Sequence, residues 1–334
     1  MDSKVNQGSR SNEIDMLNGP LFRKILVFAL PLAASSLLQE LFNSVDVAVV
    51  GHFVGSEALA AVGSNAPVIG LLINLFMGIS MGACAIISNH IGQQDDRSIR
   101  RSISTVQLVA VLSGLFLLVL GQVAARTILT WMGTPPEVLD QAVIYLRIYF
   151  LGMPFFMLYN YGAAILRAVG DTKRPLYFLI IAGVINAGLN MVLVIVFGLG
   201  VAGVGIATVF SQMVSCVLVL TCLCRTEGSY KLSFSKLSMK GYYLKQIFQV
   251  GIPAGIQSTV INFSNALLQS SVNSFGSTAM AGYTAANNIL GFLYVSINSV
   301  TQACMSFTSQ NFGVGKYKRM DRVLIDCMIL SVGA

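Results

Sequence analysis

Two acidic residues, Glu40 and Asp46, lie well inside an apolar segment of the sequence. Asp46 shares one helix face with Ser35, Gln39 and Asn43, because the four positions are spaced four, four and three residues apart. Charges at membrane depth are costly and mark functional sites by default. Burial disfavours the ionised form of Asp46, which suits a proton carrier. A carboxylate beside amides equally suits Na⁺, a hard cation that takes oxygen ligands. The competing interpretation is an acid that only holds helices together by a hydrogen bond, and for Glu40 the two interpretations are balanced.

Neutral polar side chains recur at helical spacing in later segments. Such stripes suit a wet central cleft that holds substrates weakly. The alternative is hydrogen bonding between helices, which contributes about 0.6 kcal/mol per bond in membrane proteins. Polar faces on several helices together favour the cavity. The predicted cavity residues are Gln39, Asn262, Asn265, Gln269, Asn287, Tyr294 and Asn298.

The amino-acid composition indicates that these side chains are positioned by membrane-spanning helices. Of 334 residues, 55% are hydrophobic and only 10% are charged, whereas a soluble domain carries about 25% charged residues. This balance excludes a soluble fold and a disordered chain, and six Cys are too few for a disulfide scaffold. The chain is therefore predicted to be an all-α polytopic membrane protein. The apolar segments are 21–50, 58–89, 103–125, 138–166, 176–198, 201–224, 246–273 and 279–310, with a ninth from about 323. Pro31, Pro67, Pro154 and Pro253 fall inside them and predict kinks.

Positive charge alternates between the connecting loops. Of the 21 Lys and Arg residues, 19 fall in segments on the side of the N-terminus, and Arg126 and Arg147 are the other two. The positive-inside rule therefore predicts that the N-terminus is cytoplasmic. The net charge of +7 reports this topology. Nucleic acid is not expected as a partner, because no basic patch is interleaved with base-stacking aromatic residues.

The sequence repeats itself at an offset of 221 to 222 residues. VGSEALAAVG at 54–63 matches FGSTAMAGYT at 275–284, and IGQQDDRSIRRS at 91–102 matches FGVGKYKRMDRV at 312–323. Six helices precede the second copy, so both copies have the same orientation, as in parallel-repeat transporters. We expect a leader at 1–19, a first lobe at 20–224, a basic linker at 225–245 and part of a second lobe at 246–334. The arithmetic places the end of a complete second copy beyond residue 334.

The chain offers no signature of enzymatic chemistry. It has no GxxxxGK[ST] phosphate-binding loop, and its two His and six Cys show no spacing typical of a metal site. No cofactor is expected. Energy for transport would come from an ion gradient or from the gradient of the substrate itself.

Several stretches resemble the multidrug and toxic compound extrusion (MATE) family. They are FNSVDVAVVGHFVG (42–55), LRAVGDTKRP (166–175), FGLGVAGVGIATV (197–209) and the GIP at 251–253. The resemblance implies a two-lobed fold of six plus six helices, here with the second lobe incomplete. It also implies export of organic, mostly cationic compounds in exchange for H⁺ or Na⁺.

The resemblance assigns cation coupling to Asp46, with Glu40, Asn43, Asn186 and Asn190 as further candidates. Similar transporters often carry Asn followed four residues later by Asp, and here Asn186 and Asn190 occupy those positions. The amide at Asn190 cannot carry a proton, although its carbonyl can bind Na⁺. Glu40 is a possible replacement carboxylate. This departure counts against a relay of two carboxylates.

The predicted function, which rests on the resemblance, is that of a monomeric multidrug efflux antiporter in the lipid bilayer of a bacterial inner membrane, coupled to H⁺ or Na⁺. Two alternatives remain. A lipid-linked oligosaccharide flippase can share the two-lobed fold, but its cavity should hold several cations for a pyrophosphate group. A membrane receptor or structural protein would need neither an acid on a cavity face nor a repeated architecture.

Overall fold

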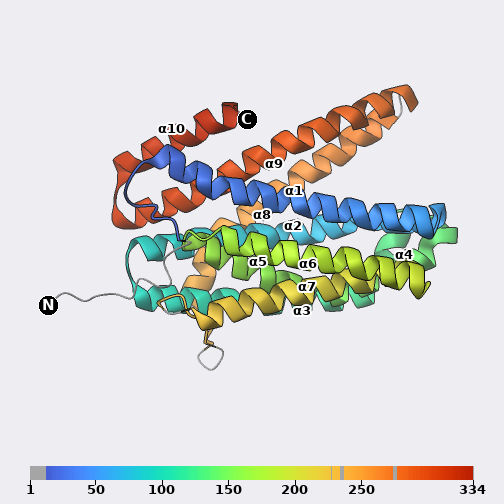
Figure 1. The fold of residues 1–334 in the computed structure, drawn as a ribbon, viewed down its shortest axis with the longest axis horizontal. Coiled ribbons are helices and arrows are strands. Elements are labelled where there is room, and N and C mark those ends of the chain that lie inside the picture. The colour runs from blue at the N-terminus through green and yellow to red at the C-terminus, as the bar shows by residue number, and fades with distance from the viewer. Residues whose placement is uncertain (1–12, 227, 234–236, 274–276, 334) are drawn as a thin grey trace.

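The computed structural model describes residues 13–226, 228–233, 237–273 and 277–333, and the regular elements of these ranges are helices (Figure 1). In part of α8 and α9 only the backbone is described, which leaves out the side chains of 266, 269–270, 273, 277–282, 284–285, 287–289 and 292. The prediction of an all-α chain is confirmed. The helices are α1 (Leu21–Phe53), α2 (Ser56–Gly92), α3 (Asp96–Trp131), α4 (Pro136–Leu151), α5 (Met153–Ala168), α6 (Lys173–Met191) with the π-turn η1 (Val192–Val196), α7 (Gly200–Arg225), α8 (Gly241–Asn273), α9 (Ser277–Val314) and α10 (Tyr317–Gly333).

The fourth predicted segment is broken into two helices. α4 and α5 meet at Gly152 and bend by 46°. Pro154 follows directly in the first turn of α5, where its missing N–H costs no helical hydrogen bond. A helix that continued straight through this point would lose the bond from residue 154 to the carbonyl of Phe150. The break is therefore the local solution to a proline in a membrane-spanning sequence.

Five described helices are long and apolar enough to cross a membrane by themselves, namely α1, α2, α3, α6 with η1, and α7. The bent pair of α4 and α5 is a sixth candidate span. α8 and α9 have 33 and 38 residues, enough to cross the bilayer at about 1.5 Å per residue. The chain is a multi-pass membrane protein.

α8 and α9 lean away from α1 and α2 toward the end of the molecule opposite the N-terminus (Figure 1). We call α1–α7 the first lobe and α8–α10 the second lobe. The two lobes cross most closely where α2 passes α8. A Cβ atom added to Gly78 would lie 2.2 Å from the backbone nitrogen of Gly255, and one on Gly82 would lie 2.6 Å from that of Gly251. Small residues allow such close approach of helix backbones in membranes.

Contacts near the other end of α2 agree with the repeat. An added Cβ on Gly92 would meet the carbonyl oxygen of Gln310 at 2.1 Å, and one on Gly313 would meet that of Asn89 at 2.3 Å. Residues 89 and 310, and 92 and 313, are equivalent at the offset of 221. The two contacts are therefore the same contact made twice, as a two-fold relation between the copies requires.

Residues 13–19 of the predicted leader form a strap that joins both lobes. From the second lobe, Lys316 Nζ donates to the carbonyl of Leu17 at 3.0 Å and Arg319 Nη2 donates to that of Gly19 at 3.0 Å. From the first lobe, the carbonyl of Gly170 accepts a bond from the backbone N–H of Ile14 at 3.2 Å. The strap is thus tied down on two sides instead of forming a free tail.

We expect the double variant Lys316→Ala/Arg319→Ala to release the strap. Each lost hydrogen bond contributes about 1 kcal/mol, so the locally open fraction rises at least about tenfold. Limited proteolysis of the purified protein, followed by loss of an N-terminal tag, measures this. Lys318→Ala is the matched control, because the Lys318 side chain is exposed. Equal cleavage rates in the double variant and the wild type would show that the strap is held by other contacts.

Candidate functional site

Asp46 lies at the centre of a polar cluster formed by three helices of the first lobe. Asn190 of α6 donates a hydrogen bond from Nδ2 to Asp46 Oδ1. The same Nδ2 lies 3.3 Å from Asn186 Oδ1, one turn earlier. Thr208 Oγ1 of α7 lies 3.5 Å from Asp46 Oδ2, and it also donates to the carbonyl of Val204 at 2.9 Å. The acid from α1 and the two amides from α6 are therefore brought together as one cluster.

The cluster is enclosed by apolar packing. Asp46 is 9% exposed, and Asn190 is fully buried. Around them α1, α4 and α7 contribute Val49, Tyr145 and Val204 to one hydrophobic cluster. No Lys, Arg or His pairs with Asp46 among the described residues. An isolated buried carboxylate is costly in its charged form, so the site favours a bound cation or proton.

Several oxygens of the cluster are available to a cation. Asn190 Oδ1 is buried and accepts no hydrogen bond within the described part of the chain. Together with Asp46 Oδ2 and Asn186 Oδ1 it forms an oxygen-rich set of the kind that hard cations take. Buried acceptors normally have partners, so this unsatisfied oxygen fits an ion ligand. A proton is an equally suitable occupant, because a protonated Asp46 carboxyl group could itself donate a hydrogen bond within the cluster.

The other two candidates on α1 lie apart from this cluster. Glu40 and Asn43 are both exposed. For Glu40 the helical period explains this, because it lies six residues before Asp46 and points to another face of α1. Asn43 lies three residues before Asp46, on the predicted shared face, and is exposed nonetheless. The structure therefore groups Asp46 with Asn186 and Asn190, and it leaves Glu40 and Asn43 outside the group.

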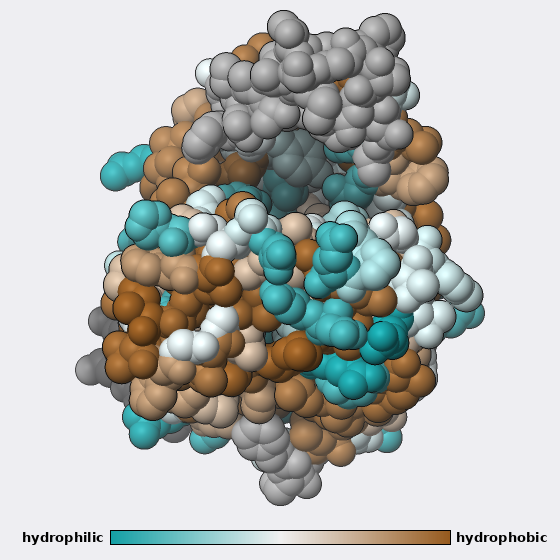
Figure 2. Space-filling model, turned by 90° about the vertical axis from the view of Figure 1, so that its right-hand side faces the viewer, coloured by the Kyte–Doolittle hydropathy of each residue, from teal (hydrophilic) through white to brown (hydrophobic). Residues whose placement is uncertain are grey.

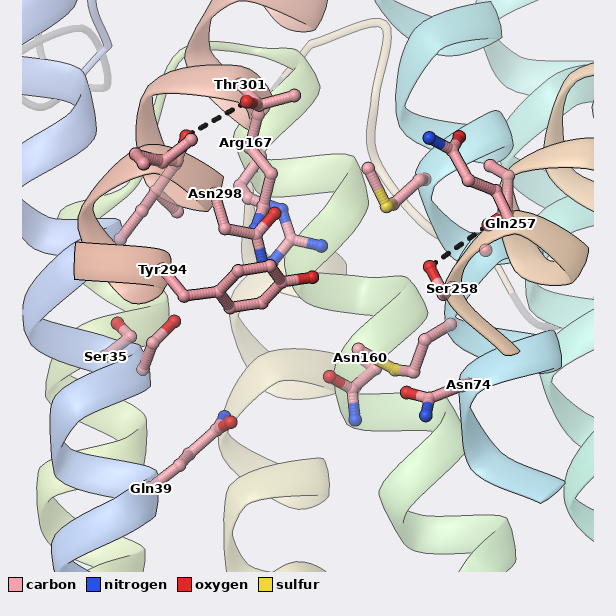
Figure 3. Close-up of a pocket in the computed structure, with 18 of the residues that line it drawn as sticks. Ser35, Gln39, Asn74, Asn160, Arg167, Gln257, Ser258, Tyr294, Asn298 and Thr301 are labelled. Carbon is pink, nitrogen blue, oxygen red and sulfur yellow. Dashed lines mark hydrogen bonds between the residues drawn. The ribbon is translucent and has the colours of Figure 1, made fainter. Parts of the chain in front are cut away.

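A cavity of about 510 Å³ lies between the two lobes. Figure 2 shows a hollow with hydrophilic side chains at the end where the second lobe leans away. The polar cavity residues come from α1, α2, α5, α8 and α9, and Figure 3 shows the side chains of Gln39, Asn160 and Tyr294 pointing into the space between these helices. The polar cavity residues are Ser35, Ser36, Gln39, Asn74, Tyr159, Asn160, Arg167, Gln257, Ser258, Asn262, Tyr294, Asn298, Thr301 and Gln302.

Four of the seven predicted cavity residues line this space, namely Gln39, Asn262, Tyr294 and Asn298. Asn265 is exposed and is not among the lining residues. The side chains of Gln269 and Asn287 lie outside the described residues.

Sequence reasoning missed Asn74, Asn160, Arg167 and Gln257, which also line the cavity. Asn74 and Asn160 stand in segments without a polar stripe, so no periodic signal marks them. Gln257 lies five residues before Asn262, the first predicted cavity residue of α8. Arg167 directly follows the predicted segment 138–166 and was therefore assigned to a loop, whereas it lies in the last turn of α5.

α1 connects the cavity to the buried acid. Gln39 lines the cavity and Asp46 lies seven residues further along the same helix, which corresponds to roughly 10 Å at 1.5 Å per residue. A change of charge at Asp46 therefore acts on the helix that forms one wall of the cavity. This arrangement can link cation binding to the shape of a substrate site.

The sequence profile of the MatE family matches residues 31–192 and 253–334. The chain is 32% identical to "Probable multidrug resistance protein YoeA" of Bacillus subtilis, and the match covers 91% of this chain and 67% of that protein. It is 22% identical to "Multidrug export protein MepA" of Staphylococcus aureus over 94% of this chain and 69% of that protein.

The fold matches solved structures of the same kind. A MATE transporter crystallised in the bent conformation superposes with a TM-score of 0.89, at 23% identity, over 98% of this chain and 72% of that one. An outward-facing multidrug resistance MATE transporter superposes with a TM-score of 0.88 at the same identity and coverage. The profile match, the identity to the Bacillus protein and the shared fold lead to one conclusion: this chain belongs to the MatE family of membrane transporters and is not an enzyme.

Proposed function

We propose that the protein is a secondary active multidrug exporter, in which inward flow of H⁺ or Na⁺ through the Asp46 cluster drives organic compounds out of the cell. The observation that carries the proposal is the placement of a buried, unpaired carboxylate and a cavity wall on one helix. The names of the similar Bacillus and Staphylococcus proteins, which refer to multidrug resistance and multidrug export, support it.

The coupling follows from the charge of Asp46. With a cation or proton bound, the cluster is neutral and tolerates tight apolar packing around α1. Without it, the bare carboxylate favours a conformation in which water reaches the site. A ligand shifts such an equilibrium only by its difference in affinity for the two states. The same residue must therefore hold its cation with different strength in the two states, and Pro31 gives α1 a point at which to bend.

The direction of transport follows from the orientation proposed for the chain. The predicted cytoplasmic N-terminus places the strap and the positively charged loops inside, and the end where the lobes diverge outside. A bacterial inner membrane supplies both candidate ion gradients. The proposal treats 20–224 and 246–334 as the two moving lobes and requires no second copy of the chain.

The test measures export of a fluorescent organic dye from energised bacteria that produce the full-length protein. The proton and sodium gradients are collapsed separately. We expect export to stop when one of them is removed, and that ion is then the coupling ion. Export that survives the loss of both gradients contradicts the proposal.

The rival function is flipping of a lipid-linked oligosaccharide. One observation supports this rival function: Arg167 gives the cavity a positive charge. A pyrophosphate group would require several cations, and Arg167 is the single Lys or Arg among the described lining residues. Absence of dye export with both gradients intact would favour this rival, and transport of a lipid pyrophosphate would then be measured.

A further inference from the structure

The cavity between the lobes carries an unbalanced positive charge. Arg167 is its one basic lining residue, and no Asp or Glu is found among the described residues that line it. Within the described part of the chain, the wall formed by α8 and α9 supplies no carboxylate either, because residues 246–315 contain no charged residue. Glu40 follows Ser36 by one helical turn on α1, so the nearest acid on that wall lies beyond the lining toward the open end.

Arg167 has no anionic partner of its own. The acid closest to it in sequence, Asp171, faces Arg174, with the carboxylate 3.2 Å from the Arg174 Nε. Asp171 Oδ1 also accepts the backbone N–H groups of Lys173 and Arg174 at the start of α6. Within the described residues Arg167 therefore forms no ion pair. A cation that lines a cavity without an anionic partner among the described residues is a candidate for binding an anionic group of a ligand.

The surroundings of Arg167 fit an aromatic ligand with an acidic group. Figure 3 shows Arg167, Tyr294 and Asn298 pointing into the same part of the cavity. The guanidinium group offers a planar fork that binds a carboxylate through two hydrogen bonds. Tyr294 is 58% exposed and presents its ring to the cavity. Met77 and Met81 on α2 supply adaptable apolar surface for the rest of the molecule.

We propose that Arg167 forms a subsite for the acidic group of the transported compound, so that the cavity prefers aromatic organic acids and zwitterions over purely cationic compounds. This inference rests on the proposed export function and specifies its substrate class. It departs from the mostly cationic substrates that the family resemblance implies. The physical reason is that a purely cationic compound meets Arg167, whereas the described lining residues include no carboxylate to attract it.

The test is equilibrium binding of two dyes to the purified full-length protein in nanodiscs of neutral phosphatidylcholine. The dyes are a rhodamine with a free carboxylate and its methyl ester, which share one fluorophore and differ only at the acidic group. Fluorescence polarisation gives both dissociation constants without any ion gradient. A failure of gradient-driven export therefore remains distinguishable from a failure of this inference.

We expect the wild type to bind the carboxylate form about tenfold more tightly than the ester, in line with a two-bond Arg–carboxylate pair. Arg167→Gln should weaken binding of the carboxylate form about tenfold and leave the ester unchanged. Arg167→Lys keeps the charge but loses the fork, so it should retain only part of the preference. Glu40→Gln is the matched control and should leave the preference intact.

Three results would overturn the proposal. Equal weakening of both dyes in Arg167→Gln would assign Arg167 a structural role. Tighter binding of the ester by the wild type, or binding of neither dye, would show that the cavity does not select aromatic acids. Loss of the preference when anionic phosphatidylglycerol replaces the neutral lipid would assign the subsite to a lipid headgroup.

Discussion

We expect Asp46→Asn to abolish uphill export while the protein still folds and reaches the membrane. The substitution keeps the shape of the side chain and an oxygen that accepts the bond from Asn190. It removes the negative charge and the ability to carry a proton. Because a buried lone carboxylate costs stability, the neutral variant should be at least as stable as the wild type. Its defect is therefore in coupling and not in folding.

The size of the effect follows from the driving force. One charge moved through 100 mV supplies about 2.3 kcal/mol, which corresponds to a concentration ratio of roughly 50. We expect Asp46→Asn to bring this ratio down to 1, as measured by dye accumulation in cells with an intact gradient. Asn43→Ala on the same helix is the control, since Asn43 is exposed and lies outside the cluster. Uphill export by Asp46→Asn would remove Asp46 from the mechanism.

Helical periodicity alone could place the acid on a polar face of α1, because membrane helices are long and regular. The same reasoning identified Asn186 and Asn190 as a pair one turn apart. Periodicity could not predict that Asn190 of α6 contacts Asp46, because it describes one helix at a time. Contacts between helices depend on how the helices pack. The family resemblance supplied that link as an expectation. The contact of Thr208 with Asp46 was not predicted, because no polar stripe was assigned to the segment 201–224.

The cavity was predictable where polar residues repeat and unpredictable where they stand singly. Gln39 and Asn298 belong to stripes, and the structure places both on the cavity wall. Asn160 reaches the wall because α5 starts afresh after the break at Gly152, which changes the direction of the helix. Arg167 carries the unbalanced charge of the cavity, and it was assigned to a loop because charged residues near segment ends normally belong to loops. The errors thus arise at a helix break and at a helix end.

The crossing of α2 and α8 should be highly sensitive to added side-chain volume. A methyl group on Gly78 would lie 2.2 Å from the nitrogen and 2.3 Å from the Cα of Gly255, both backbone atoms that cannot rotate away. The helices must separate by more than 1 Å to reach an ordinary contact of about 3.5 Å. We expect Gly78→Ala to destabilise the protein by about 3 kcal/mol, the upper range for overpacking. Thermal unfolding of the purified protein measures this loss.

The control lies in the same helix. Gly63 has nothing within 4 Å of an added Cβ, so Gly63→Ala should leave stability unchanged or raise it slightly through better helix propensity. Gly255→Ala approaches the same gap from the other side, with its Cβ 2.6 Å from the carbonyl oxygen of Leu75. Once one methyl group has forced the helices apart, the second costs less, so the double variant Gly78→Ala/Gly255→Ala should lose less than the sum of the two. If the losses of stability in the two single variants add up in the double variant, the two glycines do not share one interface. That result would contradict the close crossing of α2 and α8.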